Sequence, residues 1–275
     1  MAKFVNRTRK SISIPLRLLR EGNIHLIPIY YLFLLSDLAK EGVKNSGSYK
    51  FADHVYQGVP KGRFVLGKLI DWVFLNMRSA RSFKNRHIHA KEEILKNLKK
   101  FQNEKTIHVM SIPSGIPRYF IEISDQLSSA SPSLYKKISF HCFDLDIKVH
   151  ELTKEILAGK DSNFVFHRGN ALRADHYNIN PHIIVSTGFG EFLDDEMLVE
   201  FYQTCYSKLL KGGVFITTAT DKEPLSEYLM RNLGELNAYY RTKNDVEKIF
   251  AKTLFKDVST YRDRIGLQTI VVAKK

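Results

Sequence analysis

Short apolar runs separated by amphipathic stretches occupy the chain from Thr106 onward, and this alternation restricts the fold more than any other feature. The runs are residues 107–110, 138–143, 164–167, 183–187 and 214–218. Each has the length of a buried strand, and the stretches that follow have mostly the apolar spacing of helices. Strands that alternate with helices form a parallel sheet covered by helices. The sequence therefore predicts an α/β fold for this part of the chain.

The end of the chain has a different pattern. After Pro224, residues 225–240 and 244–255 have helical spacing, and residues 257–261 and 268–273 resemble the two strands of a hairpin. Together with the five earlier runs, this predicts a Rossmann-like, mostly parallel seven-stranded sheet with a C-terminal antiparallel hairpin.

The first hundred residues have a helical pattern instead. Helical spacing occurs in residues 14–19, 26–40, 64–77 and 89–101, and turn-forming residues interrupt it at 45–48 and 58–62. We expect this part to be a helical N-terminal cap that precedes the sheet.

The net charge of +13 is concentrated in that cap. Residues 1–100 contain 20 Lys and Arg against 7 Asp and Glu, whereas residues 101–275 contain 22 of each. A basic surface attracts phosphates, acidic lipids or nucleic acid. The charge and the change of pattern together predict a basic helical region over residues 1–102 and a second domain over residues 103–275.

Cysteine usage and the lengths of the apolar runs indicate in which compartment the protein is found. Cys142 and Cys205 lie in apolar periodic segments, so we expect two buried thiols in a reducing compartment. No metal is expected, because the Cys and His residues lack ligand spacing. No apolar run reaches the ~20 residues that span a bilayer, and no secretory signal is evident. A cytoplasmic location is expected. The acid-free, basic residues 1–20 keep a peripheral contact with an anionic membrane surface open.

Four loops follow the first four predicted strands. In an open α/β sheet, ligands bind at the carboxyl ends of the strands. The loops are Ser111-Ile-Pro-Ser-Gly-Ile-Pro117, Asp144-Leu-Asp146, Gly169-Asn-Ala171 and Ser186-Thr-Gly-Phe-Gly190. Together these loops offer a ligand a carboxylate, an amide, apolar walls and a glycine-containing turn.

These loops resemble, in order, the motifs of the class I S-adenosylmethionine-dependent methyltransferases over about residues 106–275. Asp144 matches that family's acidic residue for the ribose hydroxyls, and Gly169-Asn-Ala171 matches its Gly-Asp-Ala beside the adenine. The resemblance implies S-adenosyl-L-methionine as the cofactor. The cofactor-binding residues that it predicts are Ser111, Pro113, Ser114, Gly115, Tyr119, Asp144, Leu145, Asn170, Ala171, Ser186 and Thr187.

The first loop departs from the family pattern. Ser111 replaces the acid that often helps to hold the cofactor's amino group, and Pro113 and Pro117 remove two backbone N–H groups. Only Gly115 keeps the freedom for close approach of a ligand. The loop can keep its shape and make weaker contacts, which leaves a non-catalytic methyltransferase-fold interaction protein as an alternative.

The residues that act on the methyl acceptor are less evident. By the resemblance, the acceptor site lies over the sheet, and the basic cap of residues 1–102 helps to build it and selects the substrate. Glu191 follows the fourth strand, and His54 and Tyr56 belong to a polar-aromatic stretch with Tyr49 and Asp53. Each also has a plain structural interpretation, as a core side chain, a packing ring or a helix cap, so the catalytic residues stay open.

The function expected is methyl transfer to a small, anionic or amphiphilic (lipid-like) acceptor. The apolar and basic residues 14–20 and the apolar residues 26–35 favour such an acceptor. An RNA-binding protein or RNA methyltransferase that uses the basic cap is the alternative, so nucleic acid is not excluded. The chain has no recognisable RNA-binding module.

Overall fold

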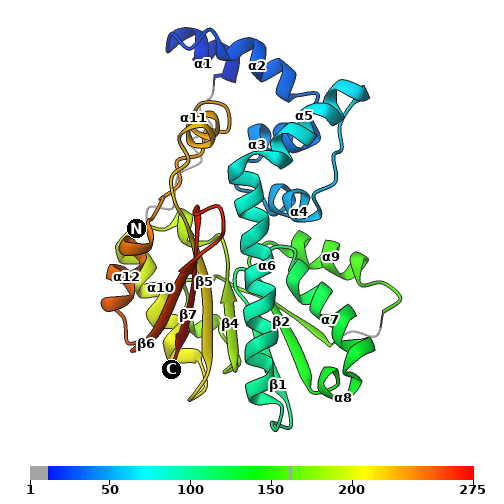
Figure 1. The fold of residues 1–275 in the computed structure, drawn as a ribbon, viewed down its shortest axis with the longest axis vertical. Coiled ribbons are helices and arrows are strands. Elements are labelled where there is room, and N and C mark those ends of the chain that lie inside the picture. The colour runs from blue at the N-terminus through cyan, green and yellow to red at the C-terminus, as the bar shows by residue number, and fades with distance from the viewer. Residues whose placement is uncertain (1–11, 161–162) are drawn as a thin grey trace. The chain divides into compact units, whose positions relative to one another are not determined.

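A computed structural model describes residues 12–160 and 163–275 of the 275-residue chain (Figure 1). The chain forms two compact units. Residues 12–84 and 222–239 make up one, which we call the helical unit; residues 85–221 and 240–275 make up the other, which we call the sheet unit.

The sheet unit contains one seven-stranded sheet of order β3-β2-β1-β4-β5-β7-β6. Strands β1 to β5 are parallel, and β7 is antiparallel to both β5 and β6. The strands are β1 Ile107–Ser111, β2 Ile138–Asp144, β3 Phe164–Arg168, β4 Ile183–Ser186, β5 Val214–Thr220, β6 Asp257–Arg262 and β7 Gln268–Lys274. The predicted fold class is confirmed, with every strand within two residues of the predicted run.

Two cores cover the two faces of this sheet, because successive strand residues point to opposite sides. Val109 joins the core with Ile94 of α6, whereas Met110 joins the core with Phe201 of α10. Both cysteines are free and buried in these cores. The helices of the unit are α7 Arg118–Ala130, α8 Pro132–Tyr135, α9 Ile147–Ile156, α10 Asp195–Lys208, α12 Lys243–Ala251 and most of α6 Arg78–Leu98, with short 3-10 turns η1 Lys99–Phe101, η2 Ala174–His176 and η3 Gly190–Phe192.

The helical unit has a small core of Leu18, Leu26, Val43 and Leu233. Its helices are α1 Ile14–Arg20, α2 Leu26–Phe33, α3 Asp37–Lys44, α4 Tyr49–Gln57, α5 Phe64–Asn76 and α11 Pro224–Asn232. The first turns of α6 also belong to it.

Three helix predictions were wrong. Residues 26–40 form two helices, because the Ser36 hydroxyl accepts a hydrogen bond from the Ala39 N–H and caps α3. The helix predicted at residues 89–101 begins at Arg78. Only Pro224–Asn232 of the segment predicted at 225–240 is helical.

The compact units also divide the chain differently from the expected boundary at residue 102. Helix α6 is continuous across residue 84, and its Ala90, Ile94 and Leu98 are fully buried in a core of the sheet unit. Residues 222–239 come after β5 in the chain and yet supply Leu233 to the core of the helical unit.

Candidate functional site

The loop after β1 is fastened to the strands on both sides of it. The Ile112 N–H donates to the Val185 carbonyl of β4 at 2.9 Å, and the Ser114 N–H donates to the Phe143 carbonyl of β2 at 2.8 Å. Gly115 has a φ of +50°, in the left-handed region that favours glycine. The loop is therefore a fixed turn at the carboxyl edge of the sheet.

Asp144, the last residue of β2, is the central polar group of this edge. Its Oδ2 accepts the Gly115 N–H at 2.9 Å, and its Oδ1 accepts the Asp146 N–H at 3.0 Å. A carboxylate oxygen accepts two hydrogen bonds, so each oxygen keeps capacity for a further donor. The next side chain, Leu145, is 60% exposed. A carboxylate with spare acceptor capacity beside an exposed apolar side chain fits a ribose attached to a flat base.

The loop after β3 lies next to Asp144. The Gly169 N–H donates to the Asp144 carbonyl at 3.0 Å, and a Cβ on Gly169 would lie only 2.4 Å from Cζ of Phe143. Asn170 Oδ1 accepts the Leu172 N–H at 2.9 Å and shapes the turn. Ala171 is buried, and its carbonyl accepts the Tyr177 hydroxyl at 2.6 Å. Asn170 thus fixes the loop and keeps one further lone pair on its amide oxygen.

The loop after β4 carries Glu191, which is buried. Its Oε1 accepts Nη1 of Arg86 at 3.2 Å and the Thr220 hydroxyl at 2.5 Å. Its Oε2 is buried without a hydrogen-bond partner among residues 12–160 and 163–275. The Arg86 guanidinium also lies against Gly188, where an added Cβ would come within 2.8 Å of Nη2. The loop therefore holds a buried ion pair with one unused carboxylate oxygen.

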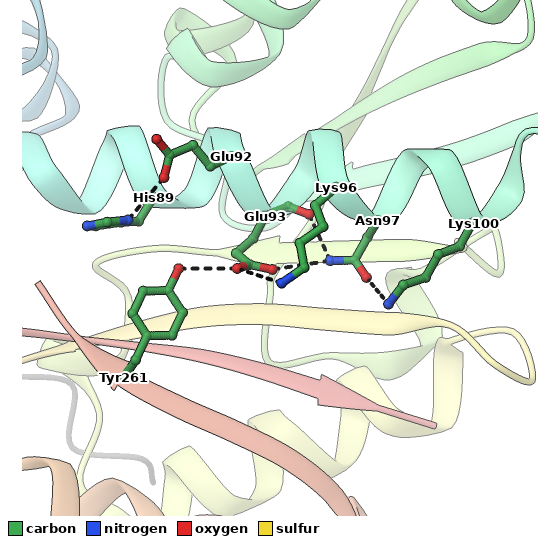
Figure 2. Close-up of polar contacts among 7 residues, drawn as sticks. All are labelled: His89, Glu92, Glu93, Lys96, Asn97, Lys100 and Tyr261. Carbon is green, nitrogen blue, oxygen red and sulfur yellow. Dashed lines mark hydrogen bonds and ion pairs between the residues drawn. The ribbon is translucent and has the colours of Figure 1, made fainter.

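Arg86 was missed by the sequence analysis. It is one of many basic residues in α6 and carries no motif, so its burial could not be read from the sequence. Closer to the C-terminal end of α6, the Tyr261 hydroxyl of β6 donates to Glu93 Oε1 at 3.3 Å (Figure 2). Within the helix, Asn97 Nδ2 donates to the Glu93 carbonyl at 2.8 Å. Lys100 Nζ donates to Asn97 Oδ1 at 2.6 Å. The bond from Tyr261 helps to fix α6, and with it Arg86, on the sheet unit, whereas the bonds of Asn97 and Lys100 lie within α6 and η1.

A second buried arginine shapes the same loop. Arg241 donates from Nη1 to the Gly190 carbonyl at 2.7 Å and from Nη2 to the Leu193 carbonyl at 2.6 Å. It also pairs with Asp195 at 2.8 Å. These bonds fix the backbone on both sides of Glu191.

The comparison with protein families shows the class of protein to which the chain belongs. The profile of a family described as "Putative methyltransferase" matches residues 36–275. The chain belongs to this methyltransferase family. The predicted resemblance to the class I S-adenosylmethionine-dependent methyltransferases is confirmed, and so is the enzyme class. No curated protein sequence matches the chain.

Solved structures similar to this methyltransferase share its fold at low sequence identity. A possible exported protein from Bordetella parapertussis has a TM-score of 0.76 at 18% identity, over 95% of this chain and 93% of that chain. The CurJ carbon methyltransferase has a TM-score of 0.60 at 16% identity, over 96% of this chain and 72% of that chain. Magnesium protoporphyrin IX methyltransferase from Synechocystis PCC 6803 with bound SAM has a TM-score of 0.51 at 11% identity, over 81% of this chain and 90% of that chain.

Ser111 and Tyr119 contact each other in this methyltransferase. Their hydroxyl groups are 2.5 Å apart and both side chains are buried. The pair fastens the first turn of α7 to the end of β1, and Pro117 is the N-cap of that helix. Ser114 Oγ is buried and has no hydrogen-bond partner in the described part of the chain. Ser114 and Gly115 are therefore better placed than Ser111 to serve a ligand.

The last two predicted cofactor residues end β4. Ser186 is buried, and its carbonyl accepts the Thr217 hydroxyl at 2.8 Å. Thr187 follows it and is partly exposed. The predicted residues of the first four strand ends therefore lie along one edge of the sheet, because β3, β2, β1 and β4 are parallel neighbours.

His54 and Tyr56 lie on α4 of the helical unit. His54 Nε2 is 3.0 Å from the Val59 carbonyl oxygen and 3.3 Å from Oδ2 of Asp71. The ring of Tyr56 stacks on Phe83, with centroids 5.5 Å apart. These contacts give both side chains structural roles within their own unit.

The described residues contain neither a candidate metal-binding cluster nor a candidate membrane-spanning helix. Residues 12–160 and 163–275 hold no group of three or more His, Cys, Asp and Glu side chains arranged to bind a metal ion. No helix in those ranges combines the length and apolar character needed to cross a membrane.

Proposed function

We propose that the chain binds S-adenosyl-L-methionine along the carboxyl edge of β1 to β4 and transfers its methyl group to a small, anionic or amphiphilic acceptor. Asp144 carries this proposal. It joins the loops after β1 and β3 through hydrogen bonds and keeps acceptor capacity on both carboxylate oxygens.

The residues of this edge suit the parts of that cofactor. Asp144 would accept the ribose hydroxyls, Leu145 would cover the adenine, and Asn170 would offer its amide beside the base. The unpaired Ser114 hydroxyl and the Gly115 backbone would serve the methionyl end. When bound, the cofactor supplies an electrophilic methyl group on a sulfonium sulfur.

Glu191 is the proposed base for the acceptor. Arg86 and Thr220 hold Oε1, which leaves Oε2 to accept a proton from a hydroxyl or ammonium group as that group is methylated. Arg86 is a positioning residue in this proposal, because it orients the carboxylate and does not touch the reacting atoms.

The acceptor class rests on charge and exposed apolar surface. The 20 basic residues against 7 acidic ones in residues 1–100 favour an anionic group, and the exposed apolar side chains of the helical unit favour an acyl or similar chain. We propose that residues 1–102 select the acceptor and residues 103–275 bind the cofactor, in a cytoplasmic protein that contacts a membrane surface.

Calorimetric titration with S-adenosylhomocysteine tests the cofactor site. We expect the wild type to bind and Asp144→Ala to bind about 10- to 100-fold more weakly, because hydrogen bonds to a charged acceptor contribute about 1.5–3 kcal/mol. Asp146→Ala is the matched control. The Asp146 side chain accepts the Lys148 N–H and caps the N-terminus of α9. Its removal should leave the affinity for S-adenosylhomocysteine unchanged. Unchanged binding by Asp144→Ala would refute the site, and no binding by the wild type would refute the proposal.

The acceptor class is tested by incubating the protein and labelled cofactor with cell extract. We expect label in the lipid-soluble or small anionic fraction. Label that ribonuclease releases would support the RNA alternative instead. Cofactor binding without transfer to any fraction would support a non-catalytic role.

A further inference from the structure

Helix α5 has its apolar residues on the outside. The side chains of Val65, Leu69 and Trp72 are 84%, 53% and 55% exposed, and Leu66 and Val73 are also exposed. These positions recur with spacings of three and four residues, so they share one face of the helix. The buried residues of α5 are Gly67 and Asp71. The usual arrangement of an amphipathic helix is reversed.

Asp71 and Gly67 fix this orientation. Asp71 is fully buried, and its carboxylate accepts the Ser36 hydroxyl, the Leu38 N–H at 3.2 Å and the Lys61 N–H at 2.7 Å. A Cβ on Gly67 would lie 2.2 Å from the Leu35 carbonyl oxygen, so only glycine allows this close approach. Rotating α5 to bury its apolar face would remove the partners of a buried carboxylate.

The start of α5 also exposes an aromatic ring. Phe64 is 81% exposed and has a φ of +56°, in the left-handed region that is strained for a residue with a side chain. The helical unit thus maintains a strained backbone at a position where a large apolar side chain projects into solvent.

The exposed charged side chains of the segment that contains this face, residues 58–76, are all basic, although the exposed Asp37 lies next to Lys61. Lys61, Arg63 and Lys68 are exposed at the start of α5, whereas the acid within the helix, Asp71, is buried. An apolar face with a single tryptophan and a basic margin matches the surface of a bilayer that contains anionic lipids.

We propose that the exposed face of α5, formed by Phe64, Val65, Leu66, Leu69, Trp72 and Val73, docks on an anionic membrane surface with the helix lying in the plane of the interface. The membrane contact expected from the sequence involved residues 1–20, and this face is a separate element. The inference rests on the membrane contact of the proposed function and assigns that contact to α5. Binding to vesicles needs neither cofactor nor acceptor, so its failure is distinguishable from a failure of the proposed methyl transfer.

Trp72 makes the test direct, because it is the only tryptophan of the chain. We would mix the full chain with vesicles of phosphatidylcholine containing phosphatidylserine, and with vesicles of phosphatidylcholine alone, and record tryptophan fluorescence and flotation. With the anionic vesicles we expect a shift of the emission to shorter wavelength and flotation with the lipid. We expect both signals to be much weaker with neutral vesicles and to fall at high salt.

Matched variants locate the contact. Leu69→Asn should weaken flotation by about tenfold or more, because it removes one apolar side chain from the interface. Leu254→Asn is its control, since Leu254 is 54% exposed and lies in the sheet unit. Lys68→Glu should weaken binding by at least about fivefold and reduce the preference for anionic lipid, and Lys256→Glu should not. Circular dichroism would verify that all four variants fold.

Any of four results would overturn the proposal. One is absence of flotation and of any fluorescence shift with the wild type. The second is equal binding to neutral and anionic vesicles, and the third is equal loss in Leu69→Asn and Leu254→Asn. The fourth is a shift that appears without lipid, rises with protein concentration and accompanies a dimer in light scattering, which would show that a second copy covers the face.

Discussion

Single carboxylates have three different roles in this methyltransferase, and their partners decide which. Asp71 is satisfied by three donors from its own unit and is structural. Asp144 takes two backbone N–H groups and keeps capacity for a ligand. Glu191 has one oxygen held by Arg86 and Thr220 and one buried oxygen that has no partner among the described residues. An unsatisfied buried acceptor is costly, so it indicates a position kept for a donor.

Glu191→Gln tests the proposed base. The amide keeps the size of the side chain and cannot take a proton, so we expect methyl transfer to the identified acceptor fraction to slow by about 10²- to 10⁴-fold. Affinity for S-adenosylhomocysteine should stay close to that of the wild type. Glu196→Gln, an exposed position on α10, is the control. An unchanged single-turnover rate in Glu191→Gln would refute the role of Glu191 as base.

At the scale of elements, three neighbouring strands are connected by histidines. His108 Nδ1 of β1 lies 3.0 Å from His141 Nε2 of β2, and His141 Nδ1 lies 2.8 Å from His167 Nε2 of β3. The ring of His182, just before β4, stacks on His108. Burial lowers the pKa of all four, and neighbouring histidines also lower that of His141, His167 and His182, so that the pKa of His141 falls to about 3. The row is therefore neutral near pH 7.

This row predicts a loss of stability in acid. In the unfolded chain these histidines bind protons below their ordinary pKa of about 6.5. In the folded chain they bind protons only at a lower pH. The stability is therefore fully present above pH 6.5 and is lost as the pH falls from there toward 3. Each histidine that stays neutral contributes a slope of up to about 1.4 kcal/mol per pH unit.

Thermal unfolding of wild type and His141→Asn over this pH range measures the effect. We expect the variant to be less stable near pH 7, because His108 and His167 lose a partner, and to lose less stability on acidification. The exposed His25→Asn is the control. An equal pH slope in wild type and His141→Asn would show that the row does not carry the acid sensitivity.

At the scale of the whole molecule, the chain leaves the sheet unit after β5 and returns to it before α12. The two ends of this excursion are adjacent, because the Arg241 N–H donates to the Thr220 carbonyl at 2.9 Å. All the proposed cofactor residues lie in the sheet unit. Residues 222–239 are therefore an insertion whose removal leaves the sheet and its ladder of hydrogen bonds complete.

An excised sheet unit tests this division. A chain of residues 85–221 joined by a short Gly-Ser linker to residues 240–275 should fold, as judged by circular dichroism and by dispersed NMR signals, and should keep its affinity for S-adenosylhomocysteine. The control is residues 85–275 with the insertion kept. It should be less soluble, because Leu233, now 1% exposed, loses Leu18, Leu26 and Val43. An unfolded excised unit would show that the two units depend on each other for stability.

The sequence by itself determined the seven strands, their parallel and antiparallel parts, and the four loops at the carboxyl ends of the first four strands. These features are local: an apolar run of strand length predicts a strand, and the residues after it must lie at one edge of the sheet. The Asp144 position and the glycine-containing turn at Gly115 follow from that logic.

Only the tertiary structure decided which side chains meet. Burial of Arg86 against Glu191 and the outward apolar face of α5 each depend on partners distant in the chain. These are Glu191 for Arg86, and Ser36 and the Leu35 carbonyl for α5. Periodicity predicts that a helix forms and which of its faces is apolar. It cannot tell which face is buried when a buried carboxylate with three hydrogen-bond donors fixes the opposite one inside.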